Sequence, residues 1–320
     1  MNSSAPETCY VLLHMSNGPG GQDLKDGLRV IVEDSGRFQL SENIWMERFD
    51  KELGQKIRTA CDPPHYKINI AGYDRHLYAF VKRVTEPEKS KYAGMSELAG
   101  LVALSRLVHP TSTGDRYSAR IFRYGDKDSP IECVRFFGVS ADVSLIDARR
   151  DWLSAQDGQT LLKLVPWLQI DKKMHERIHH AYWNHESALR SYYLDIKWML
   201  VVSAFEALLN TGDQNVSRQF KDRVGQLAKH FGVVLTEDDV DKGYKLRSKL
   251  VHAESFLFGL SNILSSSEHV PLYTKLESLL RVTLLTSLLD ESFGNNFRNE
   301  ASIDSRWPVN FPVSKKKKGP

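Results

Sequence analysis

Residues 198–209 read WMLVVSAFEALL, and residues 244–253 read YKLRSKLVHA. The first stretch is an almost continuous apolar run that contains a single acid, Glu206, and the second is amphipathic with the period of a helix. Residues 218–228, which read RQFKDRVGQLA, have a helical period too and lie between them. Helices joined by short connections pack as antiparallel neighbours, so the sequence predicts a helical bundle.

The stretch at 244–253 places an arginine, a serine and a histidine near one end of its helix. Ser248 and His252 are four residues apart and share a face, while Arg247 lies about 140° from His252, so all three can border one solvent-facing groove. A guanidinium offers a planar fork of donors that suits a phosphate, and an imidazole exchanges protons near neutral pH. These are the fewest functional groups with which a protein can cleave a phosphodiester without a metal. The alternative is that basic residues simply stabilise the negative end of the helix dipole.

Glu206 is an acid inside an apolar helix, and a buried carboxylate is costly without a partner. We expect it to pair with Arg247 and to fix the orientation of the guanidinium. The alternative is a partly exposed glutamate at the rim of the bundle.

The order of these elements resembles the Apea-like branch of the HEPN superfamily: an (F/L)EALL helix, a middle helix, and a helix with the pattern Y-x-x-R-S-x-x-V-H. The resemblance covers roughly residues 172–293, and this chain has Ala253 where relatives often carry glycine after the histidine. It implies a metal-independent RNA endonuclease in which two bundles dimerise and face one shared cleft, and it suggests antiviral defence as the setting.

The resemblance assigns the catalytic roles to Arg247 and His252, with Ser248 and Glu206 in support. Cleavage through the RNA 2′-OH would leave a 2′,3′-cyclic phosphate and a 5′-OH. The alternative is a non-catalytic RNA- or nucleotide-binding or dimerisation module coupled to an N-terminal sensor. The RNA substrate, and any ligand or trigger of the N-terminal part, are left open by the sequence.

Four histidines, His175, His179, His180 and His185, lie close together in the sequence, and the first two have the spacing of helical zinc ligands. No cysteine or aspartate nearby completes a set, so we expect no metal and no cofactor. Trp183, Trp198, Tyr192 and Tyr193 fall at helical spacing and are expected in the core or at an interface rather than as platforms for bases.

The composition is that of an ordinary globular chain: 320 residues, 41% hydrophobic and 26% charged, with a net charge of +3. This mildly basic balance permits contact with nucleic acid without arguing for it. Cys9, Cys61 and Cys133 are far apart, which predicts free thiols in a reducing cytoplasm. The start of the chain does not have the pattern of a signal peptide, and the apolar run at 198–209 is too short to cross a bilayer.

The two halves of the chain differ in period. We expect an α+β domain at 1–165, whose role is left open between sensing and regulation, an all-α HEPN-like bundle at 172–295, and a disordered tail at 296–320 that contains the lysine run 315–318. In the first domain the predicted strands surround one helix, at 95–108; they are 9–15, 28–33, 66–70, 76–84, 117–124 and 131–137. The predicted helices of the bundle are 173–189, 192–209, 217–231, 237–252 and 270–289.

Overall fold

In a computed structural model, the chain folds into two compact units, Met1–Ile170 and Asp171–Pro320. The structure describes residues 8–14, 37–48, 51–61, 78–84, 93–111, 117–122, 130–134, 141, 153, 155–169, 175–212, 214–251 and 266–309. Within these residues, none of the helices combines the length and the apolar character that a membrane crossing requires.

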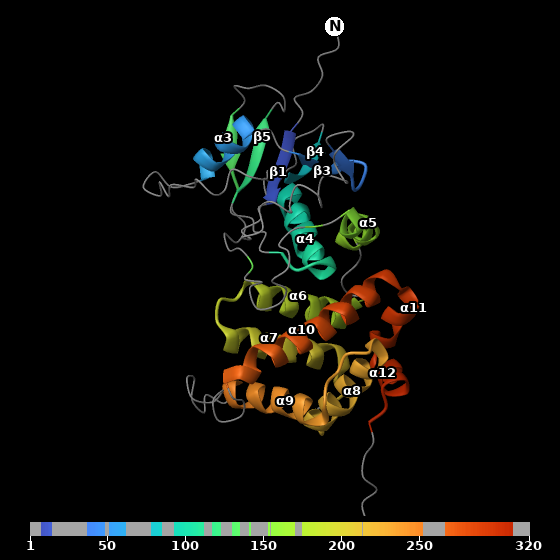
Figure 1. The fold of residues 1–320 in the computed structure, drawn as a ribbon. Helices are drawn as coiled ribbons and strands as arrows, with labels where there is room; N and C mark the ends of the chain where they lie inside the picture. Colours follow the sequence, from blue (N-terminus) through green and yellow to red (C-terminus); the bar gives the residue numbers. More distant parts are fainter. Residues whose placement is uncertain are drawn as a thin grey trace, which may run out of the picture. The chain divides into compact units, whose positions relative to one another are not determined.

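Unit 1 contains an antiparallel sheet with the strand order β2-β3-β4-β1-β5-β6 (Figure 1). The strands are β1 (Thr8–His14), β2 (Arg37–Gln39), β3 (Ile44–Arg48), β4 (Tyr78–Val84), β5 (Ser118–Phe122) and β6 (Ile131–Cys133). Its helices are α3 (Lys51–Cys61), α4 (Ala93–Val108), α5 (Ala155–Leu164) and the 3-10 helix η1 (Val165–Leu168). The α+β class predicted for this part of the chain is therefore confirmed.

The prediction of a single helix among these strands is wrong, because α3 also packs beside the sheet. Ile57 and Cys61 of α3 lie in one buried cluster with Ala119 and Ile121 of β5, and Leu53 packs against that cluster. Leu53, Ile57 and Cys61 follow one another at intervals of four residues and form a narrow apolar stripe. Such a stripe is too narrow to be recognised as a helical period in the sequence. The strands β2 and β3 were not predicted, and the strands predicted at 28–33 and 66–70 lie outside the described residues.

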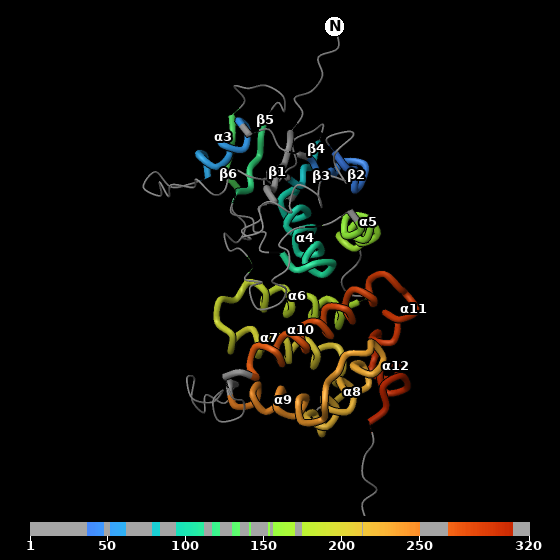
Figure 2. The backbone as a smooth tube through the Cα atoms, in the orientation of Figure 1, coloured from blue at the N-terminus to red at the C-terminus, as the bar shows by residue number. Residues whose placement is uncertain are grey.

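Unit 2 is a helical bundle, as predicted (Figure 2). Its helices are α6 (Glu176–Arg190), α7 (Leu194–Leu209), α8 (Val216–Phe231), α9 (Glu237–Val251), α10 (Ser266–Leu289), α11 (Glu291–Gly294), the 3-10 helix η3 (Asn295–Phe297) and α12 (Glu300–Arg306). The apolar helix α7 packs against α6, α8, α9 and α10.

Local sequence signals fix the ends of the helices that form the site. Thr236 and Asp239 exchange hydrogen bonds at the start of α9: the Asp239 amide donates to Thr236 Oγ1 at 3.0 Å, and the Thr236 amide donates to Asp239 Oδ2 at 2.9 Å. This reciprocal cap satisfies donors that the first turn of a helix leaves unpaired. The preceding helix, α8, ends before Gly232, whose φ of 67° is readily adopted by glycine.

The bundle continues past residue 295, where the sequence had placed the start of a disordered tail. Asn299 caps α12 by accepting a hydrogen bond from the Ser302 amide at 2.9 Å, and Ile303 and Trp307 are buried. The ring of Trp307 lies in an aromatic cluster with Phe293 and Phe297. The predicted boundary is wrong because seven helical residues carry too few apolar positions to show a period. The lysine run at 315–318 lies outside the described residues.

Candidate active site at the α7–α9 interface

Gly243 of α9 lies where this helix packs against both α7 and α10. The indole Nε1 of Trp198 on α7 donates a hydrogen bond to the Gly243 carbonyl at 3.1 Å, and Trp198 is fully buried. A Cβ atom at position 243 would stand 3.1 Å from Leu276 Cδ1 of α10, which is tighter than an ordinary contact. This packing holds the middle of α9 at a fixed distance from α7.

A column of aromatic rings sets the rotation of α9 about its axis. The ring of Phe205 on α7 lies 6.1 Å from that of Phe220 on α8, which lies 5.2 Å from that of Tyr244 on α9. Aromatic pairs at such separations stabilise one relative orientation. Since Arg247 is three residues after Tyr244, one helical turn along, the column also determines where the arginine lies.

The ion pair predicted between Glu206 and Arg247 is confirmed. Arg247 Nη2 lies 2.8 Å from Glu206 Oε2, and the two side chains are 26% and 12% exposed. Glu206 is thus not a free acid at the rim, and the arginine keeps partial access to solvent. A charge-assisted contact of this length holds the guanidinium plane in place.

Burial and the ion pair act in opposite directions on the pKa of Glu206. Burial raises the pKa of Glu206, and the charge and hydrogen bond of Arg247 offset only part of that rise. Burial also raises the pKa of the Tyr244 hydroxyl, with a further contribution from the Glu206 charge. Arg247 Nε is buried and makes no hydrogen bond within the described residues. Among the described residues, one carboxylate therefore engages only part of a five-donor group.

Of the predicted site residues, Arg247 and Glu206 are brought together and Ser248 follows on the same helix, half-buried. His252 lies outside the described residues, because the described part of the chain breaks off after Val251, the last residue of α9. The structure therefore contains the cationic half of the predicted site together with its supporting acid.

The histidines of α6 have other partners. His185 is buried and lies 2.8 Å from Glu277 of α10, which Arg281 also contacts at 3.2 Å. His179 Nε2 accepts a hydrogen bond from Trp183 Nε1 at 2.8 Å. Among the described residues, no group of three or more His, Cys, Asp or Glu side chains is arranged to hold a metal ion.

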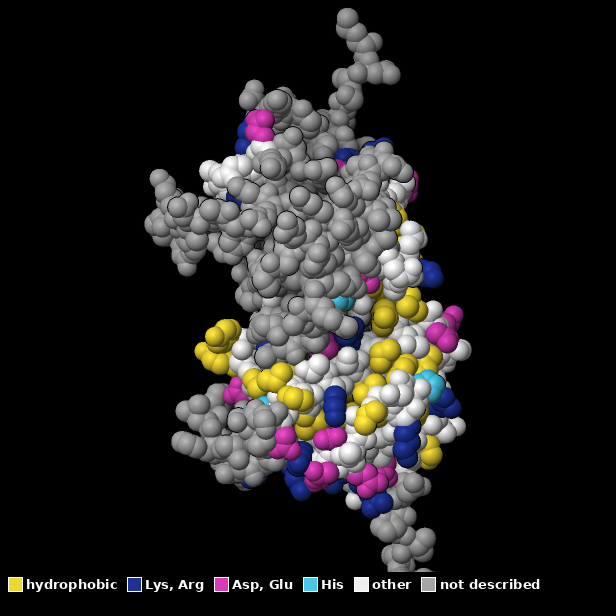
Figure 3. Space-filling view, viewed as in Figure 1, with side chains coloured by type: hydrophobic (Ala, Val, Ile, Leu, Met, Phe, Trp, Pro, Cys, Tyr) yellow, Lys and Arg dark blue, Asp and Glu magenta, His cyan; other side chains and the backbone are white. Residues whose placement is uncertain are grey.

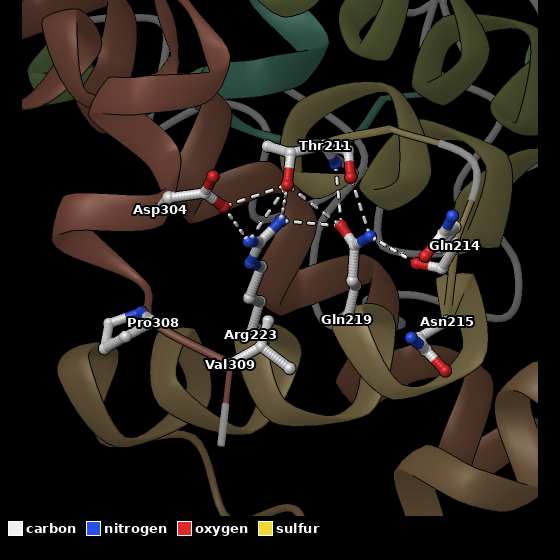
Figure 4. A pocket seen from close by; sticks show the side chains of 8 residues that line it. All are labelled: Thr211, Gln214, Asn215, Gln219, Arg223, Asp304, Pro308 and Val309. Atoms are coloured by element: carbon white, nitrogen blue, oxygen red, sulfur yellow. Dashed lines mark hydrogen bonds and ion pairs between the residues drawn. The ribbon is translucent and has the colours of Figure 1, made fainter. Parts of the chain in front are cut away.

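A second polar site surrounds Arg223 of α8 and was not predicted from the sequence. Arg223 Nε donates to the Trp307 carbonyl at 2.9 Å, Nη1 donates to Gln219 Oε1 at 2.9 Å and to the carbonyl of Leu209, and Nη2 pairs with Asp304. Figure 4 shows the contacts of Arg223 with Gln219, Thr211 and Asp304, which lie beside a pocket of about 410 Å³. The only sequence signal is the Gln219–Arg223 spacing of one helical turn, because Asp304 is 81 residues away.

Comparison with known proteins adds no relative: no family model, curated protein or solved structure matches the chain.

Proposed function

We propose that the chain is a metal-independent RNA endonuclease of the HEPN type that acts in the cytoplasm, with antiviral defence as its setting. The observation that supports this most is the Glu206–Arg247 pair, which holds a partly exposed guanidinium on the helix that leads into His252. A half-buried acid that orients a partly exposed arginine suits recognition of a phosphate.

In the proposed mechanism the RNA supplies its own nucleophile, the 2′-OH next to the scissile phosphate. His252 takes the proton of that hydroxyl, and positioned proton transfer of this kind contributes roughly a hundred- to ten-thousand-fold in rate. Arg247 stabilises the charge that develops on the phosphate oxygens. An acid protonates the leaving 5′-oxygen, which gives a 2′,3′-cyclic phosphate and a 5′-OH. DNA lacks the 2′-OH and is expected to be inert.

Glu206 and Ser248 support this chemistry without taking part in bond making. Glu206 fixes the guanidinium plane through its 2.8 Å contact with Arg247. Ser248 is available to bind substrate or to orient His252, since the two are four residues apart on the sequence. The N-terminal unit is proposed to recognise a target or to restrain the nuclease.

Cleavage of labelled RNA by the full chain in EDTA tests the proposal. We expect Arg247→Ala and His252→Ala to abolish cleavage and Lys249→Ala, which removes another cation of the same helix, to retain it. Full activity of His252→Ala would refute the mechanism. Activity that EDTA removes and a divalent ion restores would refute the metal-free chemistry.

The proposed nuclease is a homodimer in which two bundles share one cleft. Exposed aromatic residues in unit 2 favour a protein contact, since Tyr192 is 81% exposed and Tyr193 61% exposed. Figure 3 shows hydrophobic side chains at the surface where α6 passes into α7. Light scattering on the full chain is expected to give twice the monomer mass. A monomer that cleaves RNA would contradict the shared cleft and leave the nuclease chemistry standing.

A further inference from the structure

The pocket beside Arg223 has the size of a small-molecule site and a mostly polar lining. Its volume of about 410 Å³ lies in the range of ligand pockets. It is lined by residues of α8, of the turn that precedes α8, and of the segment around α12: Thr211, Gln214, Asn215, Gln219, Arg223, Asp304, Pro308 and Val309. Figure 4 shows Pro308 and Val309 on one side and Gln214 and Asn215 on the other.

The inner wall of this pocket is a saturated and therefore rigid network. Gln219 and Arg223 are 4% and 2% exposed. The Gln219 carboxamide accepts from the Thr211 amide at 2.7 Å and donates to the Thr211 and Gln214 carbonyls at 2.7 and 2.8 Å. Arg223 engages its three nitrogens with partners from α7, α8 and the α12 segment. A wall whose polar groups are all satisfied holds its shape when a ligand enters.

Unused hydrogen-bonding capacity remains at the rim of the pocket. The carboxamides of Gln214 and Asn215 make no hydrogen bond to any residue that the structure describes, and Asn215 begins α8 without capping it. Asp304 is 56% exposed and uses Oδ1 for Arg223 and for Thr211 Oγ1, which leaves Oδ2 as an acceptor. The rim thus offers more acceptors than donors.

The charge of the pocket argues against an anion as its ligand. Arg223 and Asp304 carry opposite charges and lie in direct contact, so they cancel at the distance of a bound molecule. The five donors of the guanidinium are already directed at protein acceptors. A phosphate would bring acceptors to a site that already has an excess of them.

We propose that this pocket binds an amino-bearing nucleobase, adenine or cytosine. Carboxamide side chains pair with a base edge that carries an exocyclic amine beside a ring nitrogen, as they do with adenine. Gln214 and Asn215 supply that pairing, Asp304 Oδ2 accepts from the remaining amine hydrogen, and Pro308 and Val309 give the ring an apolar surface. Binding of a base at this pocket is separate from the nuclease activity, because it requires no cleavage.

Isothermal titration of the full chain with nucleosides tests the pocket independently of cleavage. We expect adenosine or cytidine to bind at least tenfold more tightly than uridine, which has no exocyclic amine. Asn215→Gly removes the carboxamide and preserves the backbone, because Asn215 has a φ of 56° that glycine adopts without strain. This variant is expected to lose roughly tenfold in affinity. Arg218→Ala, on an exposed position of the same helix, is the matched control and is expected to bind as the parent does.

Further ligands distinguish the source of the base and the competing chemistries. Short oligoadenylate that binds more tightly than adenosine would assign the base to RNA, and equal affinity would assign it to a free nucleoside; both support the pocket. Tighter binding of inorganic phosphate or of spermidine than of any nucleoside would overturn the proposal, as would unchanged affinity in Asn215→Gly. Because Arg247→Ala leaves this pocket intact, it separates the two ideas: it is expected to abolish cleavage and retain nucleoside binding.

Discussion

Removing Arg247 is expected to destabilise unit 2 through the acid that it leaves behind. Glu206 is 12% exposed, and its pKa is raised by burial even with the arginine present. In Arg247→Ala the carboxylate stays desolvated and loses its charged partner. In Glu206→Gln the shape remains and the charge goes, while Arg247, at 26% exposure, keeps some access to water. The arginine substitution is therefore expected to cost more than the glutamate substitution.

The magnitudes follow from the kind of contact that is lost. A hydrogen bond to a charged group contributes about 1.5–3 kcal/mol, so we expect Arg247→Ala to cost about 2 kcal/mol and Glu206→Gln less than about 1 kcal/mol. Residues in contact couple by about 0.5–3 kcal/mol, so the double variant is expected to recover about 1 kcal/mol of the summed cost. In a unit of this size, about 2 kcal/mol corresponds to a Tm shift of about 4–8 °C.

Thermal unfolding followed by circular dichroism measures this cycle, and pH supplies its control. Because the folded pKa of Glu206 is raised, its contribution to stability is fully present below the unfolded pKa and is lost as pH rises through the folded pKa. At about pH 4 the carboxyl is protonated and no longer needs a cation, so the cost of Arg247→Ala is expected to shrink there. Strict additivity at pH 7, or a coupling that does not change with pH, would show that the reasoning is wrong.

Four further substitutions test other contacts in unit 2. Burial alone would raise the pKa of Glu277, but Arg281 and the His185 hydrogen bond outweigh burial, so the pKa is lowered. The carboxylate therefore stabilises the fold above its unfolded pKa, and this stabilisation is lost as pH falls. Glu277→Gln is expected to flatten the acid limb of a stability–pH profile. Gly294→Ala would place Cβ 2.5 Å from a backbone oxygen and is expected to cost about 1–3 kcal/mol in urea unfolding, whereas Gly225→Ala has open space and is expected to gain about 0.5–1 kcal/mol. Arg223→Met strands several buried acceptors and is expected to cost about 3–5 kcal/mol in the same assay, and a loss below about 1 kcal/mol would contradict a structural role.

The helices of unit 2 could be predicted because their apolar periods are long. Thr236 also marks the start of α9, and Gly232 marks the end of α8. The predicted helix at 217–231 differs from α8 by one residue at its start, and that at 192–209 differs from α7 by two. The missed elements are short: β2 has three residues and α12 has seven. In such elements the packing partners, rather than the local period, determine the structure. The one available signal for α12 was Asn299, a capping residue three positions before Ser302.

The candidate site was predictable in part for a similar reason. An acid in an apolar helix must meet a cation, and Arg247 was the cation of the next recognisable motif, so the Glu206 contact followed from chemistry. Buried contacts between distant segments gave no such clue. His185 and Glu277 are 92 residues apart, and each looks like an ordinary surface residue in its own helix. Only the folded bundle brings them together.

The Arg223 network also bears on how the chain folds during its synthesis. Residues 209–231 leave the ribosome well before residues 304–307, so for a time the arginine has its α7 and α8 partners but neither Asp304 nor the Trp307 carbonyl. Burying a half-satisfied guanidinium is unfavourable, so α8 is expected to stay loosely docked over that interval. Native packing of the bundle then waits for the α12 segment to emerge, and the nascent chain exposes its aromatic cluster to chaperones until it does.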